Sequence, residues 1–262
     1  MQWTVTTWDE FRDVWDGVHN FLMAGECVPF AFVMPPIERV VEELRLDADA
    51  RIGSGTKGPA LLLDDTAEKF RQLPLEQALT TPFTLAHFSL SRFDAPRRFL
   101  DGFKEAVLDP WQRALHDAGF TFERCYPIIF ISGVGCATNY HMDFSHVLAW
   151  QICGRKRFCG LKAPGRHAPW RARMNYAPGS LERPTDLTDD DILAYDMKPG
   201  DVLWNALLTP HWVDAGDEVA MSVNISHGGI RLNGRLCPFE QELEDYRAAN
   251  PDTAPAKVQV SY

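Results

Sequence analysis

Residues 147–161, VLAWQICGRKRFCGL, predict two β-strands joined by a tight turn. Branched and aromatic residues fill 147–153 and 156–161, and Gly154-Arg155 between them has the glycine first, which is typical of a two-residue type II′ hairpin. Three further segments have the same texture and are bounded by Gly, Pro or Asp: Tyr126–Ser132, Asp201–Leu203 and Val219–Ile225. Short strands at this spacing predict a sandwich or barrel-like β body.

The first half of the chain predicts helices instead. Thr7 and Glu10 have the spacing of a capping box, and apolar residues recur at helical spacing as far as Leu22. A second helix is expected after Pro35-Pro36, and a third over about residues 96–118, broken or kinked at Pro110. We expect these helices to pack on the outside of the β body.

Length and composition narrow the class of protein. The chain has 262 residues, 45% of them hydrophobic, which predicts one globular domain. Asp plus Glu outnumber Lys plus Arg by 36 to 26, and this net charge of −10 opposes binding to nucleic acid. No apolar run is long enough for a membrane span, and the start lacks a signal peptide, so we expect a cytoplasmic protein without a membrane partner. Six cysteines without C-x-x-C pairs argue against a disulfide scaffold.

The chemistry is concentrated around His141 and Asp143. Residues two apart on a strand project from the same face, so this pair can offer an imidazole and a carboxylate to one point. A third ligand must come from elsewhere in the chain, and His211 after the strand at Asp201 is the leading candidate. Two histidines and one carboxylate on one octahedral face are typical of non-haem Fe(II) oxygenases. The other candidates for the third ligand are His146, His167 and His227.

Three more side chains fit a small anionic ligand beside such a metal. They are the ammonium of Lys156, the hydroxyl of Thr138 and the amide of Asn224. A compact cation can neutralise a carboxylate while neutral donors orient it, so the three together predict a cradle for a dicarboxylate. Each residue alone has an ordinary reading, as a hairpin-tip lysine, a loop hydroxyl and an outward polar position on a strand.

The motifs that contain these residues resemble a known family. TNYHMD at 138–143, QICGRKRF at 151–158, PGDVLW at 199–204 and His211 are similar to the cupin-like Jumonji-C hydroxylases. Their spacing is closest to the asparaginyl hydroxylase that modifies hypoxia-inducible transcription factors. The resemblance covers roughly residues 126–226.

The resemblance implies a mainly β fold with flanking helices and a double-stranded β-helix (jelly-roll or cupin) core. We therefore expect residues 1–262 to form a single Jumonji-C/cupin-like domain. Within it, residues 1–125 would be a helical and mixed N-terminal elaboration, 126–230 the β-helix core, and 231–262 a C-terminal helix and tail.

The resemblance also implies Fe(II) and 2-oxoglutarate as cofactors. His141, Asp143 and His211 would bind iron; Lys156, Thr138 and Asn224 would bind 2-oxoglutarate; no catalytic residue is expected beyond the metal ligands. The expected reaction is hydroxylation of an unactivated C–H in a peptide or protein side chain or a small amino-acid-like metabolite, with a homodimer as one assembly to consider. The alternative is a cupin-type metal-binding module or a 2-oxoglutarate-independent dioxygenase.

The chain also departs from the family pattern. Val147 stands where the asparaginyl hydroxylase has Asn, and the segment between His211 and Asn224 is two residues shorter. Thr138 lies three residues before His141, so the two can share a face only if the backbone near 136–139 is irregular.

For substrate binding we expect the long insert of about residues 164–195 to border the mouth of the iron site. Connections this long are uncommon in compact domains and are usually functional lids or disordered segments. The candidate substrate residues are Arg171, Arg173 and Trp204.

Overall fold

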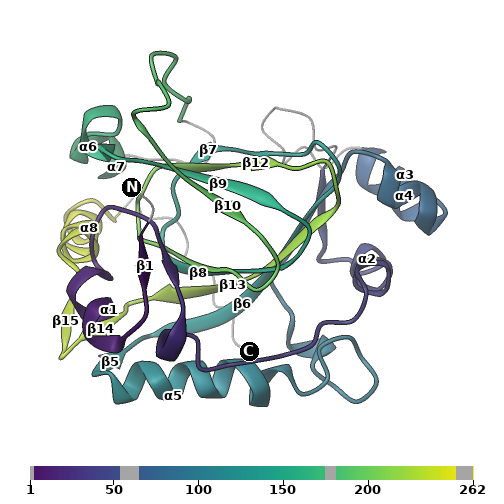
Figure 1. The fold of residues 1–262 in the computed structure, drawn as a ribbon, viewed down its shortest axis with the longest axis horizontal. Coiled ribbons are helices and arrows are strands. Elements are labelled where there is room, and N and C mark those ends of the chain that lie inside the picture. The colour runs from purple at the N-terminus through teal and green to yellow at the C-terminus, as the bar shows by residue number, and fades with distance from the viewer. Residues whose placement is uncertain (1–2, 54–64, 175–180, 252–261) are drawn as a thin grey trace.

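Two β-sheets face each other (Figure 1). A cavity lies between them. The structure is a computed structural model, which describes residues 3–53, 65–174, 181–251 and 262. The larger sheet has eight strands in the order β1-β2-β11-β8-β13-β6-β4-β3, and the smaller has four in the order β10-β9-β12-β7. The fold is mainly β with flanking helices around a jelly-roll core, as the sequence predicted.

The strands of the large sheet come from both halves of the chain. They are β1 (Thr4–Val5), β2 (Phe21–Met23), β3 (Arg51–Gly53), β4 (Thr84–His87), β6 (Arg124–Ser132), β8 (His146–Cys153), β11 (Val202–Asn205) and β13 (Ala220–Gly228). The small sheet contains β7 (Thr138–His141), β9 (Lys156–Leu161), β10 (Ile192–Met197) and β12 (His211–Ala215). A third sheet joins β5 (Phe120–Thr121), β14 (Arg231–Leu232) and β15 (Arg235–Leu236). The first half of the chain thus supplies four strands of the main sheet, and the division at residues 125 and 230 stays a prediction.

The helices lie outside the sheets (Figure 1). They are α1 (Trp8–Val14), α2 (Ile37–Arg45), α3 (Asp65–Gln72), α4 (Leu75–Thr80), α5 (Asp109–Asp117), α6 (Pro164–His167), α7 (Trp170–Met174) and α8 (Pro238–Ala249), with short 3₁₀ turns at Gly25–Cys27 and Ser91–Phe93 and a π-helical turn at Lys104–Leu108. No helix in the described ranges is long and apolar enough to cross a lipid bilayer.

Two helix predictions need correction. The capping box of Thr7 and Glu10 is present, but α1 ends at Val14, and Phe21 and Leu22 belong to β2, which pairs in parallel with β1. Pro110 does not break a long helix. The π-helical turn runs directly into α5, so helical backbone continues over 103–117 and the missing N–H of Pro110 falls just after the turn in which the regular i→i−4 ladder is interrupted.

The turn at Gly154-Arg155 is not a hairpin turn. β8 pairs with β11 and β13 in the large sheet, whereas β9 pairs with β10 and β12 in the small one. The turn therefore carries the chain from one sheet to the other. Gly154 has φ +65°, and a Cβ there would collide with the backbone at Val219 and Ala220, so glycine is needed for this crossing.

The two faces of the large sheet have different environments. On β13, Met221, Val223 and Ile225 are almost fully buried in the main hydrophobic core, which also contains residues of α1 and α5. Ser222 and Asn224 alternate with them and line the interior between the two sheets. The apolar face thus holds the helices, and the polar face lines a cavity.

Candidate metal and co-substrate site

The cavity between the sheets has a volume of about 100 Å³. The large sheet contributes Phe130, Val147, Ala149, Gln151, Asn205, Ser222 and Asn224, and the small sheet and the segment after β7 contribute Thr138, His141, Asp143, Lys156, Phe158, Met197, His211 and Val213. All six residues predicted to bind the metal or 2-oxoglutarate are in this lining.

His141, Asp143 and His211 meet at one end of the small sheet. His141 ends β7, His211 begins β12, and the two residues are directly paired in the antiparallel register. The Nε2 atom of His141 lies 3.7 Å from one oxygen of Asp143, and the Nε2 atom of His211 lies 3.5 Å from the other. Potential ligand atoms of all three residues lie within 4.8 Å of one another, a spacing that can hold a single metal ion.

Hydrogen bonds to the backbone select the histidine tautomer. The Nδ1 atom of His141 lies 2.7 Å from the carbonyl oxygen of Asn139, and that of His211 lies 2.9 Å from the carbonyl of Thr209. A carbonyl only accepts, so each Nδ1 carries the proton and donates it, and each Nε2 presents a lone pair to the carboxylate side. This arrangement is the one that metal-binding histidines use.

The three ligands differ in their access to solvent. The His211 side chain is buried and stacks on Phe158, whereas His141 and Asp143 are about 30% exposed. Burial, with a further contribution from neighbouring His141, lowers the pKa of His211 to about 4. The ring is therefore neutral near pH 7, which is the form that can coordinate a metal.

Lys156 points into the cavity, with only 8% of its surface exposed, between the exposed Arg155 and Arg157. Burial lowers its pKa to about 8. Among the residues that the structure describes, no carboxylate forms an ion pair with this ammonium. A buried and unpaired cation is costly, so the position favours an anionic ligand.

A β-bulge brings Thr138 to the cavity. In the β7–β12 register His211 pairs with His141 and Val213 pairs with Thr138, so three steps on β7 match two on β12. The extra residue turns Thr138 to the same face as His141, and the predicted irregularity is confirmed. Asn224 faces the cavity from the opposite sheet, and its Oδ1 atom is buried without a hydrogen-bond partner among the described residues.

Two of the three residues predicted to bind the substrate are buried. Trp204 is fully buried on the helix-covered face of the large sheet, where its indole N–H donates to the carbonyl of Trp15, so it cannot contact a substrate. Arg173 is also buried, and its guanidinium donates to the carbonyl of Ala168. Arg171 belongs to α7, but its side chain lies outside the described part of the structure.

The insert does not line the cavity in its described residues. Leu181 and Leu187 pack with Trp212 on the outer face of the small sheet, and the Arg183 guanidinium lies 4.0 Å above the Trp212 ring. His211 and Trp212 are neighbours on β12 and point to opposite faces, so these insert residues cover the far side of the sheet. The prediction that this part contacts the substrate is therefore wrong; residues 175–180 lie outside the described ranges.

The alternative third ligands lie elsewhere. His146 and His227 are buried next to each other in the main core, where they contact Trp204. His167 lies on α6. None of the three lines the cavity.

Sequence reasoning missed Asn205. This buried residue ends β11, and its Nδ2 atom lies 3.1 Å from Asp143 Oδ2. It pairs in register with Val147, the position at which the chain departs from the family pattern. No local motif marks Asn205, although its place two residues after Leu203 on a strand could have predicted its face.

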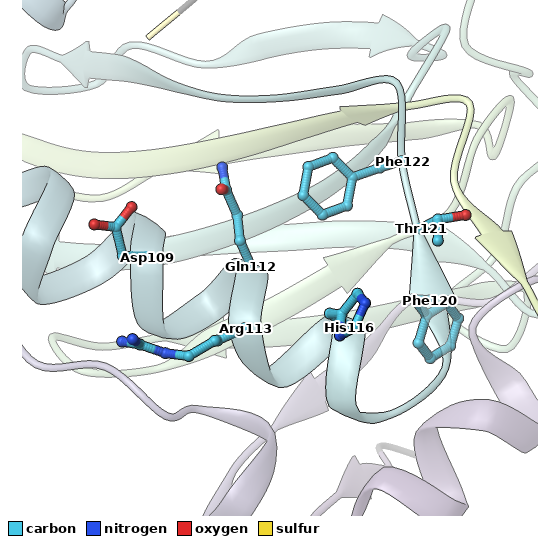
Figure 2. A pocket seen from close by; sticks show the side chains of 7 residues that line it. All are labelled: Asp109, Gln112, Arg113, His116, Phe120, Thr121 and Phe122. Carbon is cyan, nitrogen blue, oxygen red and sulfur yellow. The ribbon is translucent and has the colours of Figure 1, made fainter.

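A larger hollow of about 500 Å³ lies away from this site, against α5 and β5 (Figure 2). Its walls are Asp109, Gln112, Arg113, His116, Phe120, Thr121 and Phe122. The His116 side chain is 79% exposed, and within the described residues no set of three metal-ligand atoms meets there. The smaller cavity is therefore the better candidate for chemistry.

Comparison with known proteins supports the fold. No family model matches the sequence, and no curated protein matches it. Among solved structures, the chain is similar to the ribosomal oxygenase YcfD from Escherichia coli, with 19% identity and a TM-score of 0.51. Structures of that protein with cobalt and 2-oxoglutarate and with cobalt and succinic acid match at 18% and 16% identity, with TM-scores of 0.51 and 0.50.

In each of these three comparisons all of this chain is covered but only 64% of the other. The likeness shows that the chain shares the fold of these solved oxygenase structures. The three structures are ribosomal oxygenases, so the nearer likeness to the asparaginyl hydroxylase rests on motif spacing alone.

Proposed function

We propose that this protein is an Fe(II)- and 2-oxoglutarate-dependent oxygenase that hydroxylates a C–H bond of a protein side chain. One juxtaposition carries the proposal. The buried ammonium of Lys156, which has no ion-pair partner in the described part of the chain, shares a small cavity with two histidine lone pairs and the carboxylate of Asp143. A bound metal cation would accept the histidine lone pairs and neutralise the Asp143 carboxylate. An anionic co-substrate would neutralise the Lys156 ammonium.

The donor set fits iron. His141, Asp143 and His211 offer two nitrogens and one oxygen from one side, the facial arrangement that leaves other coordination positions open. When bound, iron would supply chelation of the 2-oxo acid and activation of dioxygen. The protein's own contribution is to hold the ligands in their Nε2-free tautomers and to keep the apolar side chains of Phe158, Met197 and Val213 against the site.

We assign the co-substrate contacts to Lys156, Thr138 and Asn224. The ammonium would pair with the far carboxylate of 2-oxoglutarate, and the hydroxyl of Thr138 and the Nδ2 group of Asn224 would donate hydrogen bonds to it. No side chain is required as a nucleophile or general base. For the substrate, the shared fold with structures named ribosomal oxygenases favours a protein over a free metabolite.

The test is anaerobic titration of the Fe(II)-loaded protein with 2-oxoglutarate. We expect a weak visible charge-transfer band, and then succinate release on addition of oxygen with a candidate substrate. A protein that binds iron and gives no band would contradict the proposal and favour the metal-binding module or the 2-oxoglutarate-independent dioxygenase. Screening ribosomal proteins against free amino acids decides between the substrate classes.

A further inference from the structure

The Asp143 carboxylate takes part in a chain of amides that begins in the first strands of the protein. The Nδ2 atom of Asn205 donates to Asp143 Oδ2 at 3.1 Å. The Oδ1 atom of Asn205 in turn accepts a hydrogen bond from the Nδ2 atom of Asn20, which immediately precedes β2. Asn20 and Asn205 are 0% and 1% exposed, so water does not compete for these bonds.

The direction of this chain is fixed by its carboxylate end. An ionised carboxylate only accepts hydrogen bonds, so Asn205 must present its NH₂ group to Asp143. Its carbonyl oxygen then faces Asn20, which must present an NH₂ group in turn. His211 does not compete, because its Nδ1–H donates to Thr209; the 3.4 Å approach of Asn205 Nδ2 to that nitrogen brings two donors together.

Asn20 is itself held firmly. Its backbone carbonyl accepts a 2.6 Å hydrogen bond from the buried hydroxyl of Tyr195 on β10. Its side-chain oxygen lies against Gly160 on β9, where a Cβ would collide with it. The side-chain amide is therefore packed between the N-terminal strands and the small sheet, and its oxygen has no hydrogen-bond partner among the described residues.

We propose that Asn205, held by Asn20, is a positioning residue that fixes the Asp143 carboxylate for the metal. The bond to Asn205 engages the oxygen that faces His211 and prevents the carboxylate from rotating. Partners of this kind orient metal ligands and contribute about 10- to 100-fold to metal affinity. This inference rests on the proposed metal site.

The experiment is titration of the metal-free protein with Co(II), read by calorimetry and by the visible absorption of the bound ion. Asn205→Leu keeps the side-chain size and removes the donor. We expect it to weaken Co(II) binding about tenfold and to change the absorption spectrum, because the carboxylate becomes free to bind in another mode.

Gln151→Leu is the matched control. Gln151 is also a buried amide in the cavity wall, but it donates to the backbone carbonyls of Cys153 and Gly154. Its replacement should lower thermal stability and leave Co(II) affinity and spectrum unchanged. Equal Co(II) affinity and identical spectra in wild type and Asn205→Leu would overturn the positioning role. If the wild type bound no Co(II), the proposed metal site itself would fail.

Asn20→Ala tests the second link and leaves every cavity-lining side chain in place. It should change the spectrum in the same direction as Asn205→Leu but less strongly. In the double variant the effects should not add, because both substitutions break one chain of contacts. Additive effects would contradict the chain. If Asn205→Leu folds poorly, the Asn20→Ala variant alone still tests the chain, and a Co(II) spectrum identical to that of the wild type would contradict it. Gly160→Ala, which displaces the Asn20 side chain, should reproduce the Asn20→Ala spectrum.

Discussion

Two clusters in the described structure have the side chains of a metal site, and they differ in which histidine nitrogen carries the proton. One cluster is His141, Asp143 and His211 at the cavity; the other is His146, Cys237 and Glu240 in the core. In the first, both Nδ1–H groups are donated to carbonyls, so both Nε2 atoms are free.

In the second cluster, His146 Nδ1 accepts the backbone N–H of Leu207 at 3.3 Å, so its proton is on Nε2, which faces Cys237 Sγ at 3.5 Å and Glu240 at 3.8 Å. A nitrogen that carries a proton has no lone pair for a metal. The comparison teaches that ligand types and distances do not define a metal site on their own; the backbone groups behind the histidines decide it. We therefore expect a metal at the first cluster and only packing and proton binding at the second.

The sharpest way to break this comparison is to replace the carboxylate of each cluster by its amide. Asp143→Asn should reduce Co(II) affinity by more than about 100-fold, because it removes a direct ligand. The residues that only orient a ligand contribute up to about 100-fold. Glu240→Gln should leave Co(II) affinity unchanged. Calorimetric titration measures both, and a loss of Co(II) affinity in Glu240→Gln would place a metal in the core.

The second prediction concerns the pH dependence of stability. Burial raises the pKa of Glu240 to about 7 and lowers that of His146 to about 3. The folded state therefore holds the Glu240 proton between pH 4.5 and 7, where the unfolded chain releases it, and the stability that this provides is lost as pH rises through 7. His146 acts in the opposite sense, and its contribution is lost as pH falls below its ordinary value of 6.5.

Glu240→Gln removes only the first contribution. Relative to wild type, its free energy of unfolding should improve by about 3 kcal/mol between pH 4.5 and pH 8, measured by urea unfolding at several pH values. A difference between the two proteins that does not change with pH would show that the Glu240 carboxyl titrates normally.

The third prediction sharpens the role of the cavity cluster. Lys156→Ala should weaken 2-oxoglutarate binding by about 2 kcal/mol, roughly 30-fold, because a charge-assisted contact is lost. Co(II) affinity without 2-oxoglutarate should not fall. Because the pKa of Lys156 is about 8, wild-type binding should also weaken above that pH as the ammonium loses its proton. Arg157→Ala, which removes an exposed neighbouring cation, is the control; an equal loss there would move the anchoring role away from Lys156.

The smallest expected effect is that of Cys237→Ser. Cys237 caps α8, and its sulfur accepts the backbone N–H of Glu240 at 3.3 Å. Serine can make the same cap, so the free energy of unfolding, measured by thermal unfolding, should change by less than about 1 kcal/mol. Metal content should not change. A change in bound metal would contradict the assignment of His146 Nε2 as the protonated nitrogen.

Local patterns predicted much of the core and the cavity lining. Alternation along 219–225 identified the two faces of β13, and the three-residue offset of Thr138 from His141 predicted an irregular backbone, which the structure has as a β-bulge. The strand spans around 147–161 were nearly right, but their partners were not. Gly154 can adopt the same positive φ in a hairpin and in a crossing between sheets, so the turn residues alone could not distinguish the two.

What the sequence did not predict depends on distant contacts. Trp204 stands in a motif near the metal ligands, but strand alternation turns it to the helix side, opposite to Asn205. Asn20 lies in a segment that its apolar spacing assigned to a helix, and its partner Asn205 is 185 residues away. No local pattern specifies a hydrogen bond between two amides at that separation.

The amide chain also has a consequence for the order in which the molecule is made. Asn205 is synthesised 185 residues after its partner Asn20, and the metal ligand His211 follows it. A chain growing from its N-terminus cannot assemble the metal centre until β12 has been completed, and the closing of so long a loop slows folding. We therefore expect chains that end before β12 to bind metal no better than isolated peptides, so that metal capture follows the synthesis of this strand.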